Sequence, residues 1–522
     1  MDTLSIIGEQ FRSALSSART FRERSRSQQE KQEKVHVVGA GATLTSAYEQ
    51  LRNAAENTEE HLLVQNAIRR FYRQLFLTRD HKDLARSGDE LAIELTLAGY
   101  LQNDSLTTKQ IKTINSLAVS YGKLLGELRA QKSQAEVAMR WVLDMMSVSI
   151  ERVLNDRSED DVFMQFCYEY FRESIDSKKL FKSKVPKDYE IALFMAIHRA
   201  LLRSDPAVIR ADLMRRYQIG PDDVKQFIAL AKHIDKVAQS KLVDKLYRLV
   251  DRLAAPERIV RRMLNDGVDV ARLLENKTQF LSAYETQVER EYKQTGARIK
   301  RAVIKSIIFL FITKALIGLA IEVPYDLIVH GHIVWVPLII NLFFPPLYMA
   351  LLSLTLTLPG SANTRALIDR ITGVLFASAA RLQLQAPQVL FAKKSRTFSV
   401  FYTLFGLLLI GMISWLLISI GFSLVHLAIF LIFLSTASFL GFRISRMVRE
   451  LEVVNSKQSF LTFIRDLFYL PFVVIGQWLS DRYAQINIIT LVLDMVIELP
   501  LKTILRLVRQ WAVFINAKKD EI

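Results

Sequence analysis

Residues 398–442 read FSVFYTLFGLLLIGMISWLLISIGFSLVHLAIFLIFLSTASFLGF. These 45 residues include no Asp, Glu, Lys or Arg, and they are about twice the roughly 20 residues that one α-helix needs to cross a bilayer. Gly421 and Ser423 lie near the middle, where the chain can reverse direction. The stretch therefore predicts an antiparallel pair of membrane-spanning helices with a very short turn.

Two further apolar runs precede this pair. Residues 334–358 contain no charged side chain, and Ile307–Ile321 is interrupted only by Lys314. With their flanks, both runs reach the length of a bilayer crossing. The sequence thus predicts a transmembrane domain over 301–458, with four spans at about 303–322, 334–358, 398–420 and 424–442.

Basic residues near the ends of these spans predict the orientation. The segment 322–333 has no Lys or Arg, whereas 359–397 carries six of them: Arg365, Arg370, Arg381, Lys393, Lys394 and Arg396. Lys and Arg are retained on the cytoplasmic side of a membrane. We therefore expect a multi-pass protein of the cell membrane with both termini in the cytoplasm.

The tail, 459–522, contains two less regular apolar segments. Residues 467–480 form a short run with Pro471 and Gly476, which favours a re-entrant or surface-lying piece. Beyond it, charged residues recur at helical spacing as one polar stripe: Asp494, Glu498, Lys502, Arg506 and Arg509. This pattern predicts an amphipathic helix in the membrane interface. The alternative, a fifth and sixth span at 467–480 and 486–501, would bury two of these acids in the bilayer.

The first 300 residues have a different composition. Residues 1–41 are rich in charged side chains, and we expect them to form a flexible N-terminal segment. Residues 42–300 show apolar positions at helical spacing, as in Leu62–Phe76, with little strand-like alternation. The predicted fold class is all-α: a cytoplasmic helical bundle, a polytopic helical membrane domain and C-terminal interfacial helices. The net charge of +16 favours contact with anionic lipids on the cytoplasmic face.

Motifs for catalysis or cofactor binding are missing from the sequence. VVGAGATLTS, residues 37–46, has glycines but lacks the Gly-Lys-Ser/Thr ending of a phosphate-binding loop. No H-E-x-x-H or G-x-S-x-G pattern occurs, and the single cysteine, Cys167, excludes an intrachain disulfide. His330 and His332 could bind a metal with Asp326 or Glu322, but polar loop residues are the simpler interpretation. We expect no enzyme activity, no cofactor and no metal.

Polar residues inside the predicted spans are the candidate site. Lys314 lies midway along the first apolar run, where an ammonium group needs a partner or water. It is predicted either to contact an ion or lipid headgroup or act as a gating charge, or else to snorkel or bond carbonyls freed by prolines in the next span. The candidates are Lys314, Asn341, Pro345, Pro346 and His426.

Two functions follow as hypotheses. The first is a membrane-anchored scaffold or adaptor, whose large cytoplasmic domain recruits protein partners or anionic lipid; no specific nucleic acid is expected. The alternative is an oligomeric channel, transporter or lipid-handling protein, with a polar path near Lys314 and the Pro345–Pro346 bend. Four spans enclose little space, so this alternative implies a homo-oligomer.

Overall fold

The computed structural model describes residues 3–37, 60–78, 84–130, 135–181, 185–376, 396–453 and 460–485. Within these ranges all named elements are helices, and extended pairing is limited to two isolated bridges. The predicted all-α fold is therefore confirmed for the described part of the chain. Contacts divide the chain into an N-terminal unit, 7–250 with 487–522, and a C-terminal unit, 1–6 with 251–486.

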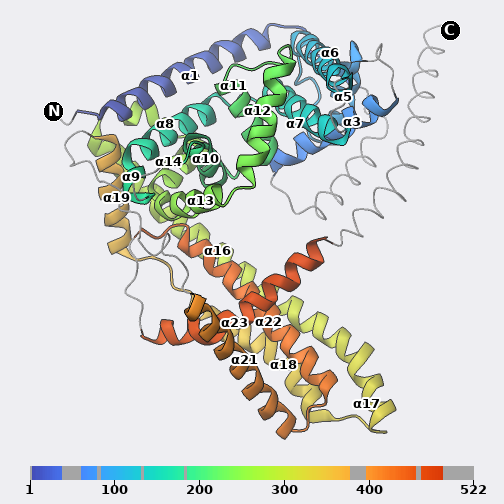
Figure 1. Cartoon of the computed structure of the whole chain (residues 1–522). Coiled ribbons are helices and arrows are strands. Elements are labelled where there is room, and N and C mark those ends of the chain that lie inside the picture. Colours follow the sequence, from blue (N-terminus) through green and yellow to red (C-terminus); the bar gives the residue numbers. More distant parts are fainter. Residues whose placement is uncertain are drawn as a thin grey trace. The chain divides into compact units, whose positions relative to one another are not determined.

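The N-terminal unit is a bundle of helices (Figure 1). Its central helix, α7, packs against α3, α6 and α11. Asp205 begins α11 by accepting a hydrogen bond from the Val208 amide at 2.9 Å, and Pro206 follows where a missing N–H is harmless. The helices are α1 (Ile6–Glu30), α3 (Glu60–Thr78), α5 (Ser87–Leu97), α6 (Thr108–Ala130), α7 (Ala135–Leu154), α8 (Ser158–Ser174), α9 (Ser177–Leu180), α10 (Tyr189–Ile197), the π-helix η1 (His198–Leu202), α11 (Pro206–Arg216), α12 (Val224–Ala238) and α13 (Lys241–Leu253).

Buried ion pairs join several of these helices. Arg210 of α11 binds Asp144 of α7 and, at 2.6 Å, Asp235 of α12. Arg69 of α3 binds Asp205, the residue that caps α11, at 2.7 Å. Each arginine thus connects helices that are far apart in the sequence, and Arg210, which is buried, would be left as an uncompensated charge if both of its partners were lost.

The C-terminal unit contains the apolar helices. Its elements are α14 (Ala255–Asn265), α15 (Val270–Leu273), α16 (Lys277–Ile317), the π-helix η2 (Gly318–Glu322), α17 (Val323–Val329), α18 (Trp335–Ser353), α19 (Ser361–Leu375), α21 (Arg396–Ser419), α22 (Leu424–Arg449) and α23 (Phe460–Gln485). The elements α16, η2 and α17 follow one another without a break and form one helix of 53 residues, Lys277–Val329.

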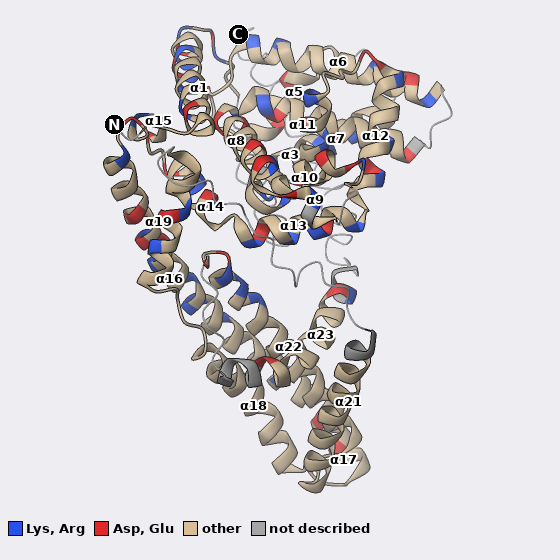
Figure 2. Ribbon diagram, turned by 60° about the vertical axis from the view of Figure 1, so that its left-hand side comes forward, with Lys and Arg blue, Asp and Glu red and all other residues tan. Residues whose placement is uncertain are grey.

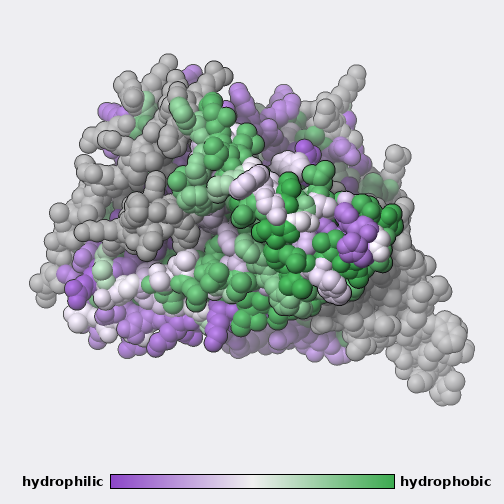
Figure 3. All heavy atoms as spheres, turned by 90° about the horizontal axis from the view of Figure 1, so that it is seen from below, coloured by the Kyte–Doolittle hydropathy of each residue, from purple (hydrophilic) through white to green (hydrophobic). Residues whose placement is uncertain are grey.

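Four described helices are long and apolar enough to cross a membrane: 277–329, 335–353, 400–419 and 424–449. Each overlaps one of the four predicted spans, as expected of a membrane protein. Charged residues are sparse on α18, α21 and the middle of α22 (Figure 2). Hydrophobic residues gather over the middle of the face shown in Figure 3. Several apolar side chains of the spanning helices are more than half exposed, such as Leu408 at 68% and Trp415 at 70%. Such surfaces suit contact with lipid.

A close helix crossing holds α22 against α23. A Cβ atom on Gly476 of α23 would lie 2.3 Å from the Ser435 carbonyl oxygen of α22, so only glycine fits there. Tyr469 and Phe472 of α23 are buried at the same contact. The short piece predicted at 467–480 is thus part of a continuous 26-residue helix, which Pro471 does not interrupt.

Three helices build the base of the C-terminal unit, where α14, the first turns of α16 and α19 pack together. Phe280 and Tyr284 of α16 are fully buried among them. Asn363 of α19 donates a hydrogen bond to the Leu451 carbonyl oxygen at 2.7 Å, which ties this base to the end of α22. The predicted loop at 359–397 therefore begins with an ordered helix, because its apolar positions have a partner surface on α16.

Candidate functional site: a buried polar cluster between apolar helices

A stripe of buried residues at intervals of four runs along the first apolar helix: Lys314, Gly318, Glu322 and Asp326. In an α-helix an interval of four overshoots a full turn by about 40°, so three intervals would rotate the last side chain by about 120°. Residues 318–322 form a π turn, whose hydrogen bonds run from i to i+5 and whose turn holds more residues. The π turn offsets part of that rotation and keeps the stripe on one face.

Pro324 explains why the helix is irregular here. It has no N–H to donate to the carbonyl of Ala320, four residues earlier, and its ring crowds that carbonyl. The irregular turn directly before Pro324 allows the helix to continue to Val329. The helix therefore continues past 322, the predicted end of the first span, and the segment predicted as a loop carries Glu322 and Asp326 on a helix.

Glu322 joins Lys314 and Asn341 at one end of this site. The Lys314 ammonium group donates to Glu322 Oε1 at 2.5 Å, and the Asn341 amide of α18 donates to the same oxygen at 2.8 Å. The Asn341 amide also donates to the His426 carbonyl oxygen of α22 at 3.2 Å. The Lys314 ammonium further lies 5.2 Å from the centre of the Phe433 ring. Three apolar helices are joined at this point.

His426 and Asp326 form the other end of the site. Asp326 Oδ2 accepts a hydrogen bond from the Val334 amide at 3.0 Å, and Asp326 Oδ1 lies 3.5 Å from His426 Nε2. On the other side of the ring, His426 Nδ1 lies 2.9 Å from the hydroxyl of Ser423, which also caps α22. Asp326 is within one turn of the end of α17, and His426 is in the first turn of α22.

Burial is nearly complete for these five side chains, which we call the polar cluster: Lys314, Glu322, Asp326, Asn341 and His426. Lys314 is 1% exposed and the other four are 0% exposed. Four of their buried atoms have no hydrogen-bond partner among the residues that the structure describes: Glu322 Oε2, Asp326 Oδ1, Asn341 Oδ1 and His426 Nε2. Unsatisfied buried polar atoms are costly, so their concentration at one place needs an explanation.

The structure brings together three of the five predicted site residues. Lys314, Asn341 and His426 are members of the polar cluster, whereas Pro345 and Pro346 are buried further along α18. The prediction that Lys314 bonds carbonyls beside these prolines was wrong, because Glu322 binds it instead. Glu322 and Asp326 were missed as site residues, although they continue the spacing of four that begins at Lys314.

Two other predictions concern the tail and a metal site. The predicted polar stripe, Asp494 to Arg509, lies outside the described residues. His330 and His332 are exposed, while Asp326 and Glu322 are buried in the polar cluster. Among the residues that the structure describes, no three His, Cys, Asp or Glu side chains are grouped as a metal ion would require.

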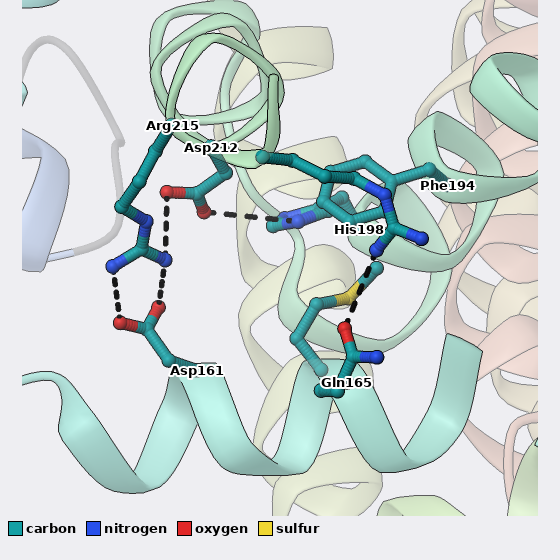
Figure 4. Close-up of a pocket in the computed structure, with 8 residues that line it drawn as sticks. Asp161, Gln165, Phe194, His198, Asp212 and Arg215 are labelled. Atoms are coloured by element: carbon teal, nitrogen blue, oxygen red, sulfur yellow. Dashed lines mark hydrogen bonds and ion pairs between the residues drawn. The ribbon is translucent and has the colours of Figure 1, made fainter. Parts of the chain in front are cut away.

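A separate hollow of about 190 Å³ lies in the N-terminal unit between α8, η1 and α11 (Figure 4). Arg215 makes hydrogen bonds of 2.6 and 2.8 Å to the two oxygens of Asp161, and Arg152 binds both Asp161 and Asp212. Burial would raise the pKa of Asp161, but the hydrogen bonds from Arg215 and Arg152 lower that pKa to about 2. His198 Nε2 lies 3.7 Å from Asp212 Oδ2. These groups largely neutralise one another and tie the helices together.

Comparison with known proteins adds no family to this description. No family model, no curated protein and no solved structure matches the chain.

Proposed function

We propose that the protein is a membrane transporter or channel for a small ion or polar solute, and that the polar cluster is where this solute acts. The observation that carries the proposal is the convergence of five polar side chains, at most 1% exposed, from three apolar helices. Ionisable residues inside spanning helices mark ion and proton pathways in membrane proteins.

Packing alone gives no reason to keep these side chains. A charged residue at the centre of a membrane helix costs about 2.5–3.5 kcal/mol on insertion scales. Buried ion pairs often stabilise a protein no better than well-packed apolar residues of the same volume do. Leucine or methionine at these positions would serve a purely structural role at lower cost, which supports a role in moving a solute.

The proposed topology has four crossings, both termini in the cytoplasm and a homo-oligomeric assembly in the cell membrane. Its support is the distribution of basic residues, since 322–333 has none and 359–397 has six. In this topology the turns at Gly331 and Gly421 face outward, and the His426–Asp326 half of the polar cluster lies closest to the outside. A reporter at Gly331 should read as external, and one at Pro387 as cytoplasmic; an inversion would contradict the orientation.

Flux through liposomes tests the transport function. The full-length protein is reconstituted, and movement of H⁺, Na⁺, K⁺ and Cl⁻ is followed with dyes for internal pH and for membrane potential. We expect Lys314→Met to reduce the wild-type flux at least tenfold. The matched control is Lys305→Met, on the same helix, because Lys305 is exposed.

A loss of flux in Lys314→Met could also come from poor folding. The double variant Lys314→Met with Glu322→Gln removes both charges of this ion pair and leaves neither member without its partner, so it should fold and still lose flux. Flux equal to the wild type in this folded double variant would contradict the proposal.

A scaffold or adaptor role is the second candidate function. The ion pairs that tie α3, α7, α11 and α12 favour it, because they make the N-terminal unit a rigid helical platform for protein partners. Basic residues exposed near the membrane ends of α16 and α22, such as Arg301 and Arg446, would contact anionic lipid on the cytoplasmic face. A pull-down in mild detergent that returned only this protein would count against the scaffold role.

A further inference from the structure

The polar cluster holds one negative charge in excess. Lys314 supplies one positive charge, while Glu322 and Asp326 each supply one negative charge, and a neutral imidazole supplies none. An uncompensated charge buried among apolar helices is strongly unfavourable. One bound proton or one bound monovalent cation would make the cluster neutral.

The Glu322 carboxylate is already paired with a cation, the Lys314 ammonium group. The Lys314 ammonium group binds Glu322 Oε1 at 2.5 Å, and Asn341 occupies the same oxygen. The excess charge therefore belongs to Asp326 and its surroundings. Asp326 has a single backbone donor, the Val334 amide, on one oxygen, while Oδ1 is left facing His426 Nε2. Asp326 Oδ1 and His426 Nε2 are too few ligands for a metal cation, but together they can hold a proton.

We propose that the His426–Asp326 pair binds one proton and that this proton is the ion whose movement the protein carries out or couples to transport. The inference rests on the proposed transport function. When the imidazole is neutral, one ring nitrogen carries a hydrogen and the other accepts one. When a proton from water adds, both nitrogens are donors, the pair becomes imidazolium and carboxylate, and the cluster becomes neutral.

Ser423 gives the proton a way in. Its hydroxyl is 2.9 Å from His426 Nδ1, and it is only half-buried at the N-terminus of α22, next to the exposed Gly421 turn. A hydroxyl can donate to a neutral ring nitrogen and then rotate to accept from a protonated one. Protonation at Nδ1 therefore needs only a rotation of the Ser423 hydroxyl, and it leaves the Nε2 hydrogen directed at Asp326.

The remaining neighbours of His426 are compatible with a positive imidazole. The Tyr325 ring of α17 and the Phe422 ring meet the imidazole edge-on, with ring centres 6.1 and 6.2 Å apart. Asn341 of α18 contacts the His426 carbonyl oxygen, and the apolar stretch 400–419 of α21 contains no charged side chain. Lys314, the nearest positive group on the first helix, is already paired with Glu322. Asp326 is thus the charged group that decides the proton affinity of this pair.

Proton binding is tested directly by NMR of histidine ring nitrogens in the purified full-length protein, with the His426 signal assigned by its loss in His426→Gln. We expect Asp326→Asn to weaken proton binding at His426 about tenfold or more, because an adjacent carboxylate favours the charged imidazole. His332→Gln, in the exposed loop, is the matched control and should leave the His426 titration unchanged. A His426 titration that is the same in Asp326→Asn and in the wild type would overturn the inference.

Proton movement is then measured in liposomes that contain a pH-sensitive dye and are subjected to a pH gradient. The wild type and His332→Gln should acidify the interior, and Asp326→Asn and His426→Gln should lose most of this activity. If both variants move protons as the wild type does while Lys314→Met abolishes flux, the proton assignment is wrong and the transport function stands. If the wild type moves none of the four ions tested, the proton assignment and the transport of these ions both fail.

Discussion

At the scale of the residue, the protein keeps ionisable side chains in places that exclude water, and each is stable only through its neighbours. Lys314 depends on Glu322, and Arg210 depends on Asp144 and Asp235. Glu257 is the exception: it is 1% exposed, and its Oε2 has no hydrogen bond among the described residues. Substituting one member of a buried pair should therefore lower the free energy of unfolding more than substituting both members does.

The Lys314–Glu322 pair tests this rule. Lys314→Met leaves the Glu322 carboxylate buried and alone, and we expect it to reduce the free energy of unfolding by about 3–5 kcal/mol. Adding Glu322→Gln should recover most of the loss, because the amide is neutral and can still accept from Asn341. Thermal unfolding in detergent measures both. A double variant as unstable as the two single losses added together would show that the two side chains do not interact.

Glu257 should make stability depend on pH. Burial raises the pKa of Glu257 to about 7, against the lowering effect of Arg370 and Arg258. The unfolded chain has its ordinary pKa of 4.5, so the favourable contribution is complete below pH 4.5, falls as the pH rises, and is lost above about pH 7. The change is about 3 kcal/mol at most. We expect Glu257→Gln to raise the unfolding temperature at pH 8 and to leave it nearly unchanged near pH 4.5.

The control for Glu257 is Glu289→Gln, because Glu289 is an exposed glutamate on α16. It should not alter the pH dependence of the unfolding temperature. If Glu257→Gln shifts that temperature equally at both pH values, the effect comes from the lost packing of the side chain and not from its protonation.

At the scale of the element, composition was enough to predict the apolar helices but not their details. Long runs without charge predict spanning helices because a helix satisfies its own backbone in lipid. The same rule did not predict a helix in 322–333, because the two acids and Pro324 of this segment are typical of a loop. The π turn that keeps Glu322 and Asp326 in line depends on which neighbours they meet, Asn341 and His426, and no local pattern reports those contacts.

Helix α23 shows the same limit in another form. Its short apolar run with Pro471 and Gly476 predicted a re-entrant or surface-lying piece, whereas the close approach of α22 explains the glycine. We expect Gly476→Ala to separate the two helices, since a Cβ atom would collide with the Ser435 carbonyl oxygen, and to lower stability by roughly 2 kcal/mol or more. Gly411→Ala on α21 is the control, as a Cβ atom there would meet nothing within 4 Å. Equal unfolding temperatures for the two variants would contradict this account of the crossing.

At the scale of the whole molecule, one helix belongs both to the membrane and to the base of the C-terminal unit. The 53 residues of Lys277–Val329 measure about 80 Å at 1.5 Å per residue, whereas the hydrocarbon core of a bilayer is about 30 Å thick. The charged first half therefore extends out of the bilayer, where it packs against α14 and α19. A displacement at the polar cluster would be carried along this helix to that base.

The length of this helix predicts opposite exposure of its two ends. In a Cys167→Ala background, cysteines are placed singly at Lys293 and His332, which are both exposed. A membrane-impermeant maleimide added to sealed cells should label position 332 and should reach position 293 only after the membrane is opened. Labelling of both positions in sealed cells would contradict a crossing between them.

The π turn also matters for how this protein could change by mutation. Such a turn is equivalent to one extra residue, and so to one extra codon, inserted into an otherwise regular α-helix. Deleting a single codon between 318 and 322 would leave the composition of the apolar run almost untouched, and a hydropathy profile would hardly register it. Yet the deletion would turn Asp326 away from His426 by about a quarter of a revolution. We expect such a deletion to leave the amino-acid composition nearly unchanged and to abolish most of the transport activity.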